Sequence, residues 1–120
     1  MADEIEYEVP LAKCVQAAQS ATAGLILNCI RYWYPKGKVR WKGKYCVAKS
    51  RRHLMQETGL SLDQVKRGLV RLRKRGLIET EIHLFWGRTI NHIILTELGK
   101  YVTGAEEPEQ ESKIDDLKYI

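Results

Sequence analysis

Basic residues crowd the middle of the chain, where their number is suited to binding a polyanion. Residues 36–75 contain fourteen Lys or Arg against two acids, Glu57 and Asp63, which gives a net charge of +12. Residues 1–9 carry four acids and no base, and residues 105–120 carry a net charge of −4. A basic centre between acidic ends indicates a nucleic-acid partner. The alternative is a solvated basic face without a partner.

One stripe of residues 61–75 could contact DNA directly, and it consists of Gln64, Arg67, Gly68, Arg71 and Lys74 or Arg75. Gln64 could bind adenine, and Arg67 could bind guanine, each through a bidentate contact. Arg71 and Lys74 lie later in the segment, where contacts to phosphate are expected. The candidate DNA-binding residues are Arg51, Arg52, Ser61, Gln64, Lys66, Arg67, Arg71, Lys74, Arg75 and Arg88.

Two further places could add contacts to this stripe. Arg51 and Arg52 begin a short helix, and phosphate commonly binds at such a position. Arg88 lies at the tip of an expected hairpin, from which it could reach the minor groove or its phosphates. Phe85 and Trp86 lie beside it, and we expect them to cap the apolar side of the hairpin, although stacking on DNA is the alternative.

The cysteines and histidines point to packing rather than to metal or redox chemistry. The cysteines are odd in number and lack the spacing of metal ligands. The histidines show no ligand pattern either, although two of them would share one face of the hairpin with Glu81. No nucleophile, base and oxyanion donor combine, so we expect no enzymatic activity, no cofactor and no metal. The residues concerned are Cys14, Cys29, Cys46, His53, His83 and His92.

A short helix, a turn and a longer helix would position the basic stripe. Ser50 predicts the N-cap of the short helix, which covers residues 51–58. Gly59 permits the turn through a positive φ. Ser61 and Gln64 form a capping box, which predicts the start of the longer helix.

The opposite stripe of the longer helix is apolar, and we expect it to hold that helix on the core. Gly76 ends the helix. Gly68 costs about 1 kcal/mol relative to Ala in a helix interior. It therefore indicates a close approach, either of DNA or of the helix expected over residues 20–34. The buried stripe is predicted to be Leu62, Val65, Leu69 and Leu72.

Helices are also expected before this pair. Pro10 can open a short helix through residue 18, and Ser20 can cap a helix of about 15 residues that Pro35 stops. Residues 36–49 predict a loop or loose hairpin that leads into a strand at about 44–48.

After the pair, residues 77–84 and 89–95 predict a two-stranded hairpin in which residue 83 faces residue 90. Thr96–Val102 adds a half-helix. The sequence thus predicts an α+β, mainly α fold: a winged helix-turn-helix with a two-stranded wing. Its parts are an acidic N-terminal segment (1–9), the winged helix-turn-helix domain (10–103) and an acidic flexible tail (104–120).

No apolar run reaches the roughly 18 residues that a bilayer span needs. The beginning of the chain, MADEIEYEVP, is acidic and lacks the features of a signal peptide. We therefore expect a cytoplasmic protein with no membrane contact.

From about residue 9 to residue 99, the chain resembles winged-helix proteins of phages and other mobile elements, which act in replication or regulation. Residues 9–34 resemble their opening pair of helices, and residues 42–61 their short strand and first helix of the pair. Residues 65–79 resemble the recognition helix running into the wing, and residues 87–99 the second wing strand. The segments are VPLAKCVQAAQSATAGLILNCIRYWY, KGKYCVAKSRRHLMQETGLS, VKRGLVRLRKRGLIE and GRTINHIILTELG.

The resemblance implies sequence-specific binding of double-stranded DNA, with transcription or replication as the output. Asp63 departs from the pattern because it places a negative charge on the exposed first turn of the recognition helix. The alternative function is a protein-interaction module, supported by the aromatic group Tyr32, Trp33, Tyr34 and Trp41. A homodimer would suit two DNA half-sites, and the acidic tail could bind a protein partner or fold back onto the basic face.

Overall fold

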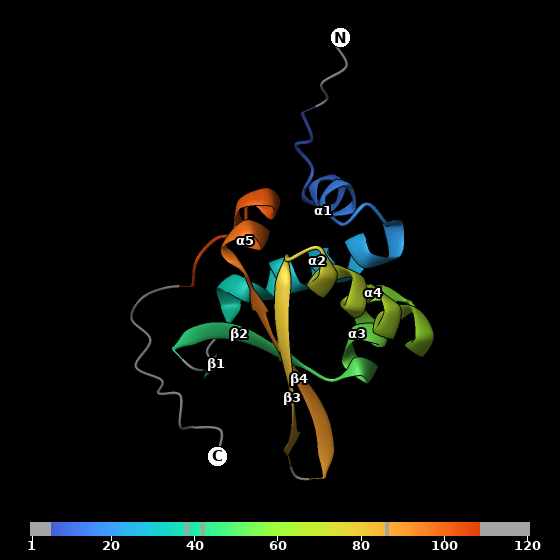
Figure 1. The fold of residues 1–120 in the computed structure, drawn as a ribbon, viewed down its shortest axis with the longest axis vertical. Helices are drawn as coiled ribbons and strands as arrows, with labels where there is room; N and C mark the ends of the chain where they lie inside the picture. The colour runs from blue at the N-terminus through green and yellow to red at the C-terminus, as the bar shows by residue number, and fades with distance from the viewer. Residues whose placement is uncertain (1–5, 38, 42, 86, 109–120) are drawn as a thin grey trace.

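A computed structural model describes residues 6–37, 39–41, 43–85 and 87–108, without the side chains of residues 84, 85, 88 and 89. These residues form an α+β fold with five α-helices and a four-stranded antiparallel sheet in the order β1-β2-β4-β3 (Figure 1). The helices are α1 (Pro10–Ala18), α2 (Ala21–Trp33), α3 (Arg51–Thr58), α4 (Leu62–Lys74) and α5 (Glu97–Thr103), with a 3-10 turn η1 (Tyr34–Lys36). The strands are β1 (Val39–Trp41), β2 (Lys44–Lys49), β3 (Ile78–Phe85) and β4 (Arg88–Leu95).

The helix starts lie where hydroxyl side chains can satisfy the first backbone N–H groups. Ser20, Ser50 and Ser61 each accept a hydrogen bond from the backbone N–H three residues later, so all three predicted N-caps are confirmed. Thr96 caps α5 in the same way. Gly59 ends α3 at φ 78°, a backbone conformation that favours glycine, and this allows the chain to turn directly into α4.

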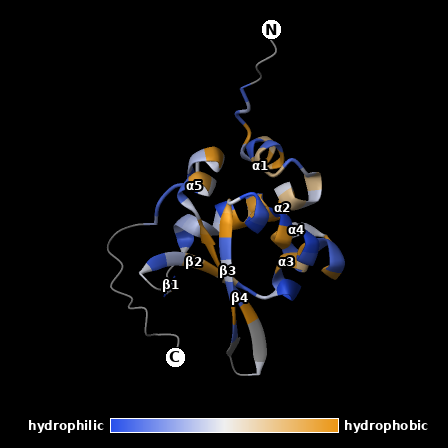
Figure 2. Cartoon of the chain, viewed as in Figure 1, coloured by the Kyte–Doolittle hydropathy of each residue, from blue (hydrophilic) through white to orange (hydrophobic). Residues whose placement is uncertain are grey.

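The core lies between α2, α4 and the sheet. Figure 2 shows apolar segments of these elements facing the centre, while the outer side of α4 is hydrophilic. Three of the four residues predicted for the buried stripe of α4 are buried, namely Val65, Leu69 and Leu72. Leu62 is 44% exposed, so its predicted burial is wrong. It lies in the first turn, and Leu60 of the preceding turn packs against the core instead.

Gly68 faces α2 and is buried. A Cβ atom at this position would lie 2.4 Å from Ile26 Cδ1 and 3.6 Å from the Cα of Ala23. The close approach that the glycine indicates is therefore packing of α4 on α2. Gly68 does not belong to the exposed stripe.

The β3–β4 hairpin follows α4 directly, and His83 faces Ile90 as predicted. β2 joins this hairpin through β4, with Val47 opposite Ile93. β1 pairs with β2 as a short antiparallel hairpin, one of the two alternatives predicted for residues 36–49, and so extends the sheet. The hairpin projects from the body of the molecule on the side opposite α1 and α5 (Figure 1).

A polar and aromatic cluster fills the sheet face shared by β1, β3 and β4. Trp41 Nε1 donates to Glu81 Oε1 at 2.7 Å, and the Trp41 ring lies 4.1 Å from the His83 ring. His83 packs edge-on against His92 at 4.8 Å. Burial lowers the pKa of His92, as does the neighbouring His83, against an opposing effect of Glu81. In the part of the chain that the structure describes, no group of three or more His, Cys, Asp or Glu is arranged to hold a metal.

The chain remains packed on the domain beyond the predicted boundary at Gly104. Ala105 packs against the core, and the carboxylate of Glu107 lies 3.2 Å from Lys100 Nζ. The hydroxyl of Tyr34 also donates to Glu107, at 3.3 Å. Ala105 and Glu107 of the predicted tail therefore contact the domain, and residues 109–120 lie outside the described residues. None of the described helices combines the length and apolar character that a membrane crossing requires.

Candidate nucleic-acid interface

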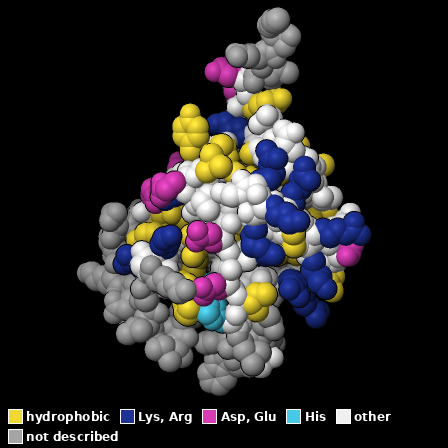
Figure 3. Space-filling model, viewed as in Figure 1, with side chains coloured by type: hydrophobic (Ala, Val, Ile, Leu, Met, Phe, Trp, Pro, Cys, Tyr) yellow, Lys and Arg dark blue, Asp and Glu magenta, His cyan; other side chains and the backbone are white. Residues whose placement is uncertain are grey.

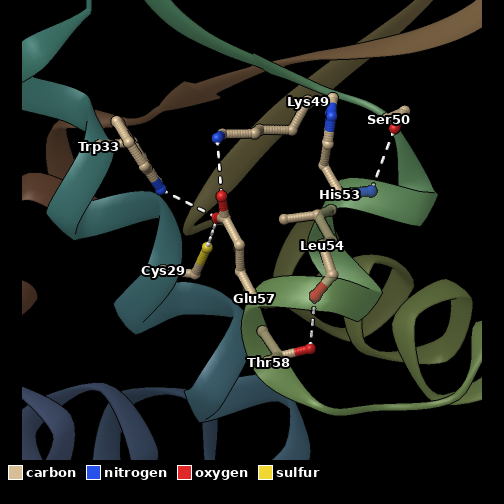
Figure 4. A network of polar contacts seen from close by, with 8 residues as sticks. All are labelled: Cys29, Trp33, Lys49, Ser50, His53, Leu54, Glu57 and Thr58. Carbon is tan, nitrogen blue, oxygen red and sulfur yellow. Dashed lines mark hydrogen bonds and ion pairs between the residues drawn. The ribbon is translucent and has the colours of Figure 1, made fainter.

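A single carboxylate joins α3 to α2 and β2. The side chain of Glu57 accepts hydrogen bonds from Cys29 Sγ at 3.0 Å, Trp33 Nε1 at 2.9 Å and Lys49 Nζ at 3.0 Å (Figure 4). The donors belong to α2 and β2, so Glu57 joins three elements. Lys49 also lies over the Trp33 ring at 3.9 Å, which adds a cation–π contact.

The network keeps Glu57 ionised. Burial alone would raise the pKa of this carboxyl, but its hydrogen bonds with Cys29, Lys49 and Trp33 outweigh that effect and lower the pKa. Burial together with the adjacent carboxylate raises the pKa of Cys29 to about 12, so the thiol stays protonated and donates. The sequence predicted only a packing role for Cys29, because its hydrogen-bond partner lies 28 residues away.

Replacing Glu57 with glutamine should destabilise the fold by about 1–2 kcal/mol at pH 7, because a charged acceptor is lost from three donors. The lowered pKa means that the carboxylate stabilises the fold above about pH 4.5 and loses this effect as the pH falls through the folded-state pKa. The deficit of Glu57→Gln should therefore narrow between pH 7 and pH 3, as measured by urea unfolding.

Glu79→Gln is the matched control, since Glu79 is 60% exposed and lies 4.0 Å from Lys44. An exposed pair of this kind contributes at most about 0.5–1 kcal/mol. Two results would contradict the role assigned to the network. One is an equal loss of stability in the two variants at pH 7. The other is a stability deficit of Glu57→Gln that stays constant down to pH 3.

The outer face of α4 is strongly basic. Lys66, Arg67 and Lys74 are exposed, and Val70 lies between them with 38% of its surface exposed. Figure 3 shows Lys and Arg side chains gathered over the side of the molecule where α4 lies. A shallow groove of about 470 Å³ runs along this face, lined by Lys66, Arg67, Val70, Arg71, Lys74 and Arg75.

Two of the candidate DNA-binding residues bind the end of α1. Arg71 donates from Nε to the carbonyl of Ala18 at 2.7 Å and from Nη2 to the carbonyl of Gln19 at 2.9 Å. Arg75 donates from Nε to the carbonyl of Ala17 at 2.8 Å. The last carbonyls of a helix lack partners within it and carry partial negative charge, so they suit guanidinium groups. Arg71 and Arg75 thus fix α1 on α4 while still lining the groove.

Polar side chains in and next to the first turn of α4 also bind one another or the nearby backbone. Gln64 Oε1 accepts from the backbone N–H of Ser61 at 2.9 Å, and Ser61 Oγ accepts from that of Gln64, which confirms the predicted capping box. A bidentate contact of Gln64 with adenine would use this same oxygen as an acceptor, so it would have to be shared with the capping bond. Arg67 Nη2 lies 2.7 Å from Asp63 Oδ2.

No protein-family model, curated protein or solved structure matches this chain.

The remaining candidate residues lie at the start of α3 and at the end of the hairpin. Arg52 is exposed in the first turn of α3. Arg51, beside it, is half-buried, and its Nε has no hydrogen-bond partner within the described residues. The backbone of Arg88 pairs with Phe85 at the hairpin end, as expected for the tip. The side chains of both, and Trp86 entirely, lie outside the described residues.

The aromatic residues considered for protein binding do not form one exposed patch. Tyr32 is half exposed, whereas Tyr34 is buried in the core. Trp33 is bound to Glu57, and Trp41 belongs to the cluster on the sheet. These separate environments give the interaction-module alternative little support.

Proposed function

We propose that this chain is a winged helix-turn-helix protein that binds double-stranded DNA, with α4 in the major groove and the β3–β4 hairpin as the wing. The observation that carries the proposal is the outer face of α4, where Lys66, Arg67 and Lys74 are exposed along a basic groove. The order of α3, a short turn, α4 and a hairpin supports it.

The dimensions of α4 suit this role. A helix with its side chains is about 10–12 Å wide, and the major groove is about 12 Å wide. The 13 residues of α4 extend for about 20 Å. Arg67 would lie near the base edges, and Lys66 and Lys74 would lie near the phosphates. We propose regulation of transcription or replication as the output, as the family resemblance implies.

Salt dependence of binding to duplex DNA tests the proposal. If about six phosphates are contacted, the logarithm of affinity should fall with the logarithm of salt concentration at a slope near −5. Fluorescence anisotropy with a labelled duplex measures this slope, and selection from a random duplex pool supplies a preferred sequence. No binding at low salt, or a slope near zero, would refute the function.

A further inference from the structure

On the basis of the DNA-binding function proposed above, we infer that Asp63 is a positioning residue that orients Arg67 to read a guanine. Asp63 lies one turn before Arg67, on the same side of α4, and the two side chains meet at 2.7 Å. Both are solvent-exposed, at 67% and 79%. The order of acid before base at this spacing is the favourable one on a helix.

The contact leaves the guanidinium able to bind a base. The closest approach is between Nη2 of Arg67 and Oδ2 of Asp63. The group has five N–H donors in a fixed plane, so a second N–H on Nη2 and one on Nη1 remain for two acceptors. The O6 and N7 atoms of guanine present two acceptors to the major groove. An arginine already held in place loses less side-chain freedom when it binds.

The charges favour a base over a phosphate for Arg67. Paired with Asp63, it adds no net charge to this face, whereas Lys66 and Lys74 each add one. A neutral pair gains little from the phosphate backbone but can still form directional hydrogen bonds. Removal of water on binding would also strengthen the pair relative to its exposed state. Asp63 therefore weakens the general attraction of this face to DNA while it increases the discrimination between sequences.

The test compares three duplexes at one salt concentration: the best sequence from the random pool, the same sequence with one guanine replaced, and a scrambled duplex. The replaced guanine is the one whose replacement weakens binding of the unaltered protein most. Arg67→Ala should reduce discrimination at that guanine about tenfold or more. Asp63→Ala should lose most of the same discrimination while binding the scrambled duplex more tightly, because it removes a negative charge.

A double-mutant cycle isolates the positioning role. In the Arg67→Ala background, Asp63→Ala should no longer change discrimination at the guanine. Asp63→Glu, which keeps the charge and can still reach Arg67, should retain part of the discrimination. Glu97→Ala is the charge control, since Glu97 is 93% exposed on α5. It should shift all three affinities by the same small factor.

Two outcomes would overturn the inference while leaving the proposed function intact. One is that Asp63→Ala tightens binding to all three duplexes equally, which would make Asp63 a repulsive charge only. The other is that its effect on discrimination persists without Arg67, which would make Asp63 a direct contact to a base such as cytosine. Absence of binding to every duplex would refute the proposed function itself, and this inference with it.

Discussion

Replacing Lys66 and Lys74 together with alanine should weaken duplex binding about 60-fold at about 0.1 M salt. Each lysine that neutralises a phosphate releases about 0.9 counterions, so losing two such contacts should make the salt slope shallower by about 1.8. Both lysines are exposed on the outer face of α4. Their removal should therefore leave the fold intact, which thermal unfolding can verify. Fluorescence anisotropy over a series of salt concentrations measures both effects.

The matched control replaces Lys36 and Lys44, which are also exposed but lie on η1 and β2. It changes the net charge by the same amount. If binding occurs along α4, this control should keep its affinity within about threefold and its slope within about 0.5. Equal losses in the two double variants would mean that the overall charge, and not the face of α4, attracts DNA.

The features predicted well are those that neighbouring residues determine. The N-caps at Ser50 and Ser61, the turn at Gly59 and the register of the hairpin depend on hydrogen bonds within a few residues. A sequence contains such information directly. Periodicity likewise predicted the buried face of α4, except at Leu62, where the helix extends past its contact with the core.

The roles of individual basic residues were harder to predict because they depend on distant segments. Arg71 binds carbonyls more than 50 residues away, and no spacing within α4 distinguishes it from Lys74. The Glu57 network joins α2, β2 and α3 and has no sequence pattern of its own. Sequence could thus predict which face of α4 is basic, but not which cations on it are already bound within the protein.

Replacing Gly99 with alanine should lower the free energy of unfolding by about 3 kcal/mol. A Cβ atom there would lie 2.1 Å from the carbonyl oxygen of Leu77 and 3.2 Å from Leu95 Cδ2. That carbonyl also accepts the backbone N–H of Thr96 at 3.1 Å, which fixes the start of α5. Because backbone rather than a flexible side-chain end blocks the new atom, α5 would have to move.

The neighbouring variant Leu98→Ala provides the control for Gly99→Ala, since Leu98 is 49% exposed on the same turn of α5. It should cost less than about 1 kcal/mol. Alanine is intrinsically favoured over glycine in a helix by about 1 kcal/mol, so without a clash Gly99→Ala would stabilise the protein. Urea unfolding measures the change in the free energy of unfolding, and the sign of that change shows whether the added Cβ atom clashes. A stabilised Gly99→Ala would contradict the close packing of α5 on Leu77, whereas a loss confined to this variant would support it.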